Sequence, residues 1–470
     1  MRTPRHMPTP QRLTCAVALL APVVMAVVCT GAATAGAATG GAATGQNWTV
    51  YHGDPAGSGD VTSVHAVATS APVWKSPNLD GQLFGEPLVD SGRVFVATEN
   101  DTVYALSSAS GAVVWQTHVG TAVPASELPC GDISPTVGIT GTPVIAAARH
   151  EVFVVADELV SGQASHSLVG LNTANGHVEL NEPVNPPHSY APALLQRTGL
   201  TLSAGRVIFG LGGNSGDCAT YRGRVVAVPE TGGAPTMFTV DAASGDSQGA
   251  IWMGGAAPSV DRAGNIWVAA GNGSVTSVTQ PYDDSDSALE LSPRLKLLQY
   301  FAPTTWRQNN AADLDMSMAP ALLPDGLVVL AGKSRIVYLL DGSRLGGVGG
   351  QESSLGDACG DDIDGGSAVV GTTVYLPCRS GIVAVAVTAS PPGLRLLWSS
   401  GTGGGPPIVA GGLVWTIGQD GTLFGLDPAT GALRRQAAIG APANHFPTPS
   451  VGDGLLLAPS AQQVVAFRAG

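Results

Sequence analysis

The chain has 470 residues, of which only 12% are charged, and a formal net charge of −13 at neutral pH. This acidic balance argues against nucleic acids and anionic lipid surfaces as partners, because both are bound through basic patches. The 63 glycines and 34 prolines suit many short strands and turns better than long helices, so an all-β fold is expected.

Residues 1–35 have the order of a secretory signal peptide. Arg2, Arg5 and Arg12 precede an apolar run over residues 13–28, and small residues follow that run. The run is too short for a comfortable transmembrane helix. We therefore expect a secreted protein, in the extracellular space or the cell envelope, with no membrane span.

A repeated phrase begins after a low-complexity Ala/Gly/Thr linker at residues 36–47. It consists of a Pro-led apolar start, a Gly turn, two alternating strands and a Thr-Gly or Ser-Gly turn, and its clearest copies start at Glu86 and Pro406. Each copy has the length of one four-stranded blade, and a period of roughly 40 to 50 residues is typical of β-propellers. Residues 48–470 are therefore expected to form one propeller domain.

Eight blade starts can be placed along this domain. Seven are led by a proline that stands beside small or apolar residues, while the eighth, at residues 365–370, lacks the proline. A Gly or Asp-Gly turn and a β-branched run follow each start, as expected for strands half-buried between stacked sheets. The seven prolines are Pro87, Pro143, Pro192, Pro258, Pro320, Pro407 and Pro449. We predict an all-β, eight-bladed β-propeller with four-stranded blades.

The last blade is short, because only about twenty residues follow Pro449. Residues 71–75 resemble an outer strand, yet they precede the first full repeat, so we expect this N-terminal strand to close the ring and cover sheet edges. Trp74, Trp115 and Trp398 fall at equivalent outer-strand positions. We expect them to pack one blade against the next.

Four cysteines lie beyond the signal peptide: Cys130, Cys218, Cys359 and Cys378. An even number in an exported chain predicts two disulfides, with three possible connectivities. We favour Cys359–Cys378, because both lie in one proposed blade, and Cys130–Cys218 then follows by elimination. A metal site is the weaker interpretation, since neither a CxxC pair nor clustered histidines accompany the thiols.

The repeat, with its A-L-D-x-x-T-G-x-x-x-W theme, resembles that of the pyrroloquinoline quinone (PQQ) family of eight-bladed propellers over nearly the whole mature chain. That family includes calcium-dependent quinoprotein alcohol dehydrogenases and non-catalytic relatives that bind protein partners. The fold alone does not choose between these functions.

Several residues match the motifs of the dehydrogenases. Trp252 is similar to the tryptophan that forms the floor under the quinone, and Asn272 to the asparagine that binds calcium. The resemblance implies Asp283 or Asp284 as the general base and Lys333 as the cationic, cofactor-binding residue that polarises the quinone. Asp283 is also a predicted metal ligand.

Each of these residues also has a structural interpretation that stays open. Trp252 could fill the channel end of a strand, Asn272 suits a turn between two glycines, and residues 283–286 could be a solvated acidic loop. Asp313 and Asp315 alternate along an extended run, so both could face one side and bind an ion.

The chain also departs from the dehydrogenases in two respects. It lacks their vicinal Cys-Cys disulfide, and no Glu stands in the stretch of residues 216–223 where their calcium-binding Glu is expected. Asp217 would replace that Glu as a metal ligand only if the loop shifts by a residue.

We therefore predict a monomeric binding or scaffold module whose partner is an envelope or extracellular protein, or a small molecule in the propeller funnel. A calcium- and PQQ-dependent alcohol or sugar dehydrogenase is the alternative, and binding of neither cofactor is an equal expectation. A third possibility is carbohydrate binding through the long loops, with Trp306 as an exposed aromatic.

Overall fold

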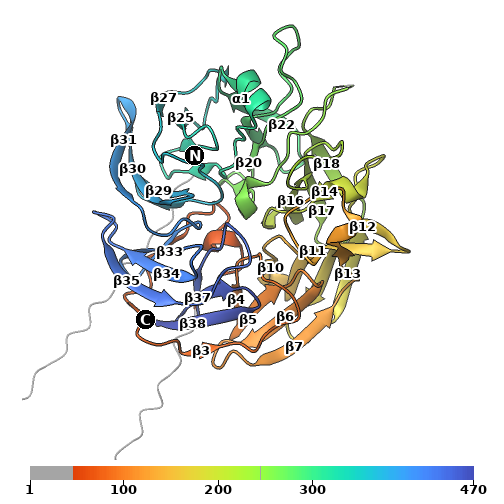
Figure 1. Cartoon of the computed structure of the whole chain (residues 1–470), viewed down its shortest axis with the longest axis vertical. Coiled ribbons are helices and arrows are strands. Elements are labelled where there is room, and N and C mark those ends of the chain that lie inside the picture. Colours follow the sequence, from red (N-terminus) through yellow and green to blue (C-terminus); the bar gives the residue numbers. More distant parts are fainter. Residues whose placement is uncertain (1–45, 244) are drawn as a thin grey trace, which may run out of the picture. The chain divides into compact units, whose positions relative to one another are not determined.

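Eight antiparallel sheets follow one another in chain order around a central axis in the computed structural model (Figure 1). The structure describes residues 46–470 apart from residue 244, and these belong to one structural unit. The predicted signal peptide and the linker up to residue 45 lie outside the described residues. The predicted eight-bladed propeller is thus confirmed, with most blades built from four strands.

Each predicted blade start coincides with an innermost strand. The strands of blades 1 to 4 are β4 (Leu88–Asp90), β5 (Arg93–Ala97), β6 (Thr102–Ser107) and β7 (Val113–His118); β10 (Val144–Ala146), β11 (Glu151–Val160), β12 (Gln163–Asn172) and β13 (Val178–Pro183); β14 (Leu194–Leu195), β15 (Thr201–Ser203), β16 (Arg206–Gly213), β17 (Arg224–Pro229) and β18 (Thr236–Thr239); and β19 (Ser259–Val260), β20 (Ile266–Ala270), β21 (Ser287–Leu291), β22 (Leu297–Ala302) and β26 (Gly347–Val348).

The second half of the ring repeats this order. The strands of blades 5 to 8 are β23 (Ala321–Leu322), β24 (Leu327–Leu330), β25 (Val337–Asp341) and β27 (Ser353–Leu355); β28 (Ala368–Val370), β29 (Thr373–Cys378), β30 (Gly381–Ala389) and β31 (Pro392–Ser400); β1 (Asp60–Val61), β32 (Ile408–Ala410), β33 (Leu413–Ile417), β34 (Thr422–Leu426) and β35 (Leu433–Ala438); and β36 (Ser450–Gly452), β37 (Leu455–Ser460), β38 (Gln463–Ala469), β2 (Val67–Ala68) and β3 (Trp74–Lys75).

Short elements occupy the connections between and within blades. They are η1 (Tyr51–Gly53), β8 (Val123–Pro124), η2 (Ala125–Glu127), β9 (Thr136–Val137), η3 (Ala147–Arg149), η4 (Ala191–Ala193), η5 (Met253–Gly255) and the helix α1 (Trp306–Ala312). None of the helices in the described chain has the length and apolar character needed to cross a membrane.

The middle strands are more deeply buried than their alternating pattern suggests. Val94, Phe95 and Val96 are successive residues of β5, and none is more than 2% exposed. Neighbouring blades cover both faces of these strands, so side chains of both orientations enter the core. Outer strands such as β7 keep mostly exposed or half-exposed residues, because nothing packs beyond them.

The outer-strand tryptophans connect neighbouring blades, as predicted. The indole N–H of Trp115 donates to the carbonyl of Thr173 in the next blade at 3.0 Å, and a Cβ on Gly176 would lie 2.6 Å from the Trp115 ring. Trp398 makes the equivalent bond to Pro428, at 2.9 Å. The turn before the outer strand of the next blade is therefore the surface on which each of these two tryptophans packs.

The N-terminal part of the described chain contributes to the last blade. Trp74 and Lys75 of β3 pair with Ala466 and Val465 of β38, and β36 contacts β4 of the first blade.

Residues 46–61 join the inner strands of several blades. Backbone bonds link Trp48 to Val89 of β4, Thr49 to β10, Pro55 to β19, and Ser58 and Gly59 to β28 and β32. Each of these strands ends at the turn that leads to the second strand of its blade, and these turns lie on one face of the ring. The segment therefore closes one end of the central channel.

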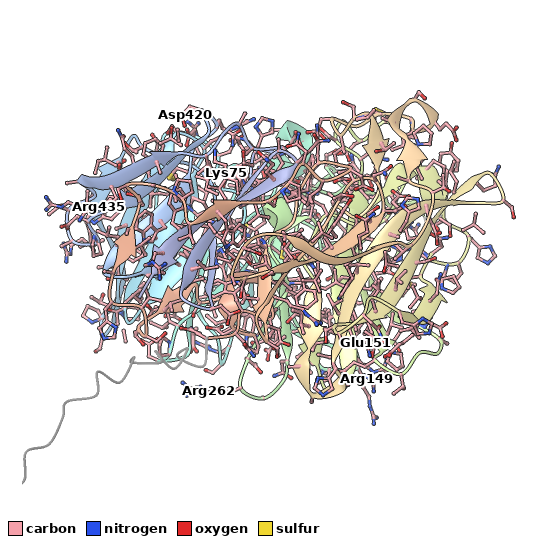
Figure 2. The ribbon with its side chains drawn as sticks, turned by 90° about the horizontal axis from the view of Figure 1, so that it is seen from below. Lys75, Arg149, Glu151, Arg262, Asp420 and Arg435 are labelled. Atoms are coloured by element: carbon pink, nitrogen blue, oxygen red, sulfur yellow. A yellow bond between two sulfur atoms is a disulfide. The ribbon has the colours of Figure 1, made fainter. Side chains whose placement is uncertain are left out.

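The two faces of the ring carry different turns (Figure 2). Arg149 and Arg262 mark turns between first and second strands, at the face near the N-terminal segment. Asp420 marks a turn between a second and a third strand, on the opposite face. The longest insertions and the ends of the second strands belong to this opposite face, where the candidate site lies.

Candidate functional site

A funnel of about 1170 Å³ opens on the face opposite the N-terminal segment. Its wall comes from residues that directly follow second strands, from the long loops of blades 1 to 4, and from α1 with the segment after it. Of the predicted site residues, Asp217, Trp252, Asn272 and Lys333 line this funnel. The structure therefore brings together four positions that are far apart in the sequence.

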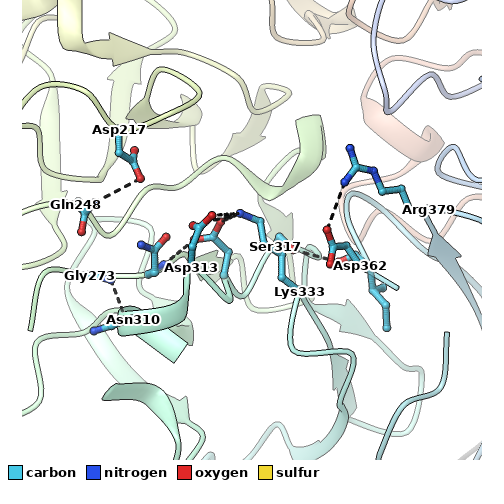
Figure 3. Close-up of polar contacts among 12 residues, drawn as sticks. Asp217, Gln248, Gly273, Asn310, Asp313, Ser317, Lys333, Asp362 and Arg379 are labelled. Atoms are coloured by element: carbon cyan, nitrogen blue, oxygen red, sulfur yellow. Dashed lines mark hydrogen bonds and ion pairs between the residues drawn. The ribbon is translucent and has the colours of Figure 1, made fainter. Parts of the chain in front are cut away.

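Asp315 connects two of these positions, Asn272 and Lys333. Lys333 is labelled in Figure 3, together with the nearby Asp313. One carboxylate oxygen of Asp315 accepts the backbone N–H of Asn272 at 2.7 Å, and the other lies 2.6 Å from Nζ of Lys333. Asp313 lies on the other side of the same ammonium, at 3.3 Å. A Cβ on Gly271 would lie 2.5 Å from Asp315, so this approach requires glycine.

The ion pair holds Lys333 in its charged form. Burial by itself lowers the pKa of this lysine, but contact with Asp315 and Asp313 outweighs burial and raises the pKa well above its usual range. The side chain of Asp315 is only 6% exposed, and the ammonium of Lys333 is the cation beside it. The wall thus presents a fixed ammonium and a fixed carboxylate side by side.

Aromatic side chains lie next to this pair. Nζ of Lys333 is 5.6 Å from the centre of the Trp252 ring, and the ring of Phe446 is 5.8 Å from Trp252. The guanidinium of Arg197 lies 5.6 Å from Phe446 and 5.7 Å from Phe84. This arrangement offers flat apolar surface and a delocalised cation to a ligand.

Arg197 marks the closed end of the funnel. It is close enough to Tyr51 of the N-terminal segment to affect the pKa of that phenol, and its Nη2 atom is buried without a hydrogen-bond partner among the described residues. A buried guanidinium nitrogen without a partner costs free energy. The closed end is therefore suited to an anionic group.

Asp217 lies across the funnel from Lys333, in the loop after β16. Its carboxylate is 3.4 Å from Nε2 of Gln248, and burial raises its pKa, with further contributions from Asp315 and Asp313. The neighbouring Gly216 lies close to the disulfide between Cys130 and Cys218. This bridge connects the loop after β16 to the long loop of blade 1, so both are held at the funnel.

Both predicted disulfides are present. The second, Cys359–Cys378, lies at the end of β29. These bonds fit folding in an oxidising compartment.

The remaining funnel acids differ in their partners. Asp362 lies 3.5 Å from Arg379 at the surface. Asp364 is buried, with one carboxylate oxygen unpartnered, and burial raises its pKa to about 6. In total, the residues that line the funnel include more aspartates than lysines and arginines together.

Asp283 and Asp284 lie outside the set of residues that line the funnel. Asp283 is buried beside Ser285, whose hydroxyl donates to it at 2.6 Å, and its carbonyl accepts the backbone N–H of Asp241. Burial raises the pKa of both Asp283 and Asp284. The acid that stands beside Lys333 is Asp315, which the sequence marked only as one of two alternating acids.

Trp306 corrects the expectation of an exposed aromatic. It begins α1 and is 1% exposed, packed edge-on against Tyr282 at 5.1 Å. The helix turns its indole into the core, so Trp306 offers no surface to a carbohydrate.

Comparisons with known proteins agree with this architecture. The model of a family described as outer membrane protein assembly factor BamB matches residues 26–280. No curated protein matches the chain.

Several solved structures share the fold at low identity. A quinohemoprotein alcohol dehydrogenase, ADHIIG, from Pseudomonas putida HK5 is 15% identical with a TM-score of 0.67, covering 90% of this chain and 80% of its own. The quinohemoprotein alcohol dehydrogenase from Comamonas testosteroni is 16% identical with a TM-score of 0.66, covering 91% and 81%. BamB from Moraxella catarrhalis is 14% identical with a TM-score of 0.55, covering 86% and 98%. Likeness at this level establishes the fold and leaves the activity to the site.

Proposed function

Because this chain belongs to the family of the outer membrane protein assembly factor BamB, we propose that it is a secreted binding module of the extracellular space or cell envelope. Its funnel takes a small, flat ligand that carries a carboxylate. The observation that carries this proposal is Arg197, buried between Phe84 and Phe446 with one guanidinium nitrogen unpartnered. A planar anionic ligand would stack on the aromatic rings and satisfy that nitrogen.

The probe for this proposal is PQQ, a flat tricarboxylate, titrated into the purified protein with and without calcium. Absorbance and calorimetry follow binding. We expect Arg197→Met to weaken binding at least tenfold, because it removes the charge and keeps an apolar side chain between the two phenylalanines. The matched control is Arg435→Met, on the exposed outer strand β35, which should bind like the wild type.

Absence of binding at high micromolar quinone would overturn the small-ligand proposal. Because the family is described as an outer membrane protein assembly factor, the next ligands to test would then be proteins. A pull-down from the cell envelope without added cofactor is the corresponding experiment.

A second candidate is a calcium-dependent quinoprotein dehydrogenase, which is favoured by the contact of Asp315 with Lys333 beside Trp252 and Asn272. The donors fit calcium, because the amide of Asn272 is accompanied in the funnel by the carboxylate of Asp217, and these are the hard oxygen ligands that calcium prefers. Trp252 supplies the aromatic floor. A bound quinone would supply the two-electron acceptor for oxidation of an alcohol.

In this candidate function the chain's own residues have distinct roles. Asp315 accepts the proton of the substrate hydroxyl, and Lys333 keeps positive charge at the site because its pKa is raised by the two aspartates. Asp283 and Asp284 are not among the residues that line the funnel. We therefore propose Asp315 as the general base in their place.

A turnover assay distinguishes the two proposed functions. Quinone binding without oxidation of alcohols or sugars by an artificial electron acceptor supports the binding module. Turnover that Asp315→Asn abolishes and Asp284→Asn leaves intact supports the dehydrogenase.

A further inference from the structure

Four acidic side chains lie together between blades 1 and 2, outside the set of residues that line the funnel. Glu99 and Asp101 come from the turn between β5 and β6, and Asp157 and Glu158 from β11. We call these four residues the Asp101 cluster. Their exposed fractions are 3%, 0%, 2% and 9%, so each carboxyl group has left water almost completely.

Gly138, in the long loop between the two blades, joins three members of the cluster. Its N–H donates to Glu99 at 2.8 Å, and its carbonyl accepts the N–H of Asp157 at 3.2 Å. A Cβ on Gly138 would lie 2.8 Å from the carboxylate of Asp101. One glycine therefore binds the side chain of Glu99 in blade 1 and the backbone of Asp157 in blade 2.

The carboxylate oxygens of the cluster are short of donors. Both oxygens of Asp101, both of Asp157 and Oε1 of Glu99 are buried without a hydrogen-bond partner among the described residues. The one ion pair recorded for the cluster joins Asp157 to Nε2 of the buried His166, at 3.4 Å. Buried carboxylates are normally paired, protonated or bound to a metal ion.

Electrostatics agree with this geometry. Burial, followed by the neighbouring charges of Asp157, Glu99 and Glu158, raises the pKa of Asp101 to about 9. Burial also raises the pKa of Glu99 to about 7. When the carboxyl groups of the cluster ionise, they therefore outnumber the two nearby cations, Arg197 and His166.

We propose that the Asp101 cluster binds one divalent cation, with calcium as the ion that its ligands suit best. The donors are carboxylate oxygens, which hard cations prefer, whereas zinc sites favour thiolate and imidazole ligands. No three of these carboxylates have oxygens within 4.8 Å of one another as the side chains stand. Binding therefore includes side-chain rotation toward the ion, which the adaptable coordination of calcium tolerates better than the strict octahedron of magnesium.

The ion would fix a loop that reaches the funnel. Gly138 ends the connection from residue 119 to residue 138, whose Asp132 and Ile133 line the funnel and whose Cys130 is bonded to Cys218. Calcium at the Asp101 cluster would anchor one end of this loop, and the disulfide holds its middle. This site does not depend on the identity of the funnel ligand.

The test is calcium titration by calorimetry on the full-length protein after removal of metal with EGTA. The funnel could also bind calcium, so the titration is done in an Asn272→Ala background, which removes a proposed funnel donor. We expect one calcium per chain, with magnesium binding at least tenfold more weakly. Addition of Asp101→Asn should weaken calcium binding at least 100-fold.

Two variants complete the experiment. Asp357→Asn, at a side chain that is 72% exposed, is the matched control and should bind calcium normally. Asp157→Asn replaces Asp101→Asn if the latter does not unfold cooperatively. Calcium binding that persists unchanged in both cluster variants, or that is absent from the Asn272→Ala protein, overturns the proposal.

Discussion

In the funnel, Asp313, Asp315 and Asp362 each lie beside a lysine or arginine, whereas in the cluster Asp101 and Asp157 lie mainly among other carboxylates. Both regions bring acids from distant parts of the sequence together. The funnel pairs half of its six aspartates with the chain's own cations, so these charges can serve a ligand without further help. The cluster lacks such compensation, and for this reason we assign it an ion from solution.

The largest expected effect comes from removing the cation of the funnel. Lys333→Met leaves Asp315 buried without its partner, and breaking a buried pair in this way should lower the free energy of unfolding by about 3 kcal/mol. Urea unfolding at neutral pH measures the change. The double variant Lys333→Met/Asp315→Asn should recover most of the loss, and a single variant as stable as the wild type would contradict the comparison.

Asp364 is the buried funnel acid that has one carboxylate oxygen without a hydrogen-bond partner among the described residues. The pH dependence of stability tests the cost of burying it. Its folded-state pKa of about 6 lies above the ordinary value of 3.8, so its contribution to stability is present below about pH 4 and is lost as the pH rises through 6. Asp364→Asn should therefore match the wild type near pH 4 and exceed it by about 2 kcal/mol above pH 7. The measurement is unfolding free energy against pH for both proteins; a difference that does not change with pH would refute the assignment.

The smallest effect is expected at the cluster without metal. Asp101→Asn in EGTA should raise the free energy of unfolding by about 1 kcal/mol at pH 8, because it replaces a buried carboxyl that lacks a partner and must take up a proton on folding. In saturating calcium the same substitution should lower it. Thermal unfolding in the two conditions detects the change of sign, which Asp357→Asn should not show.

The fold was largely predictable because its signals are local. Pro143 and Pro407 directly precede strands that begin blades, and Trp115 packs on the turn of residues 173–176 in the next repeat. The site was predictable only in part. Trp252, Asn272 and Lys333 come together at the funnel, but Asp315, rather than Asp283, is the acid beside the lysine.

The sequence by itself determined the repeat and the number of blades, because strand starts, turns and spacing repeat at short range. Only the tertiary structure decided which charges meet. Glu99 and Asp157 are about one repeat apart in the sequence and belong to neighbouring blades. Trp306 gives no sequence sign of whether it faces water or the core. Ring closure sets those neighbours, since it fixes how loops from different blades converge on one face.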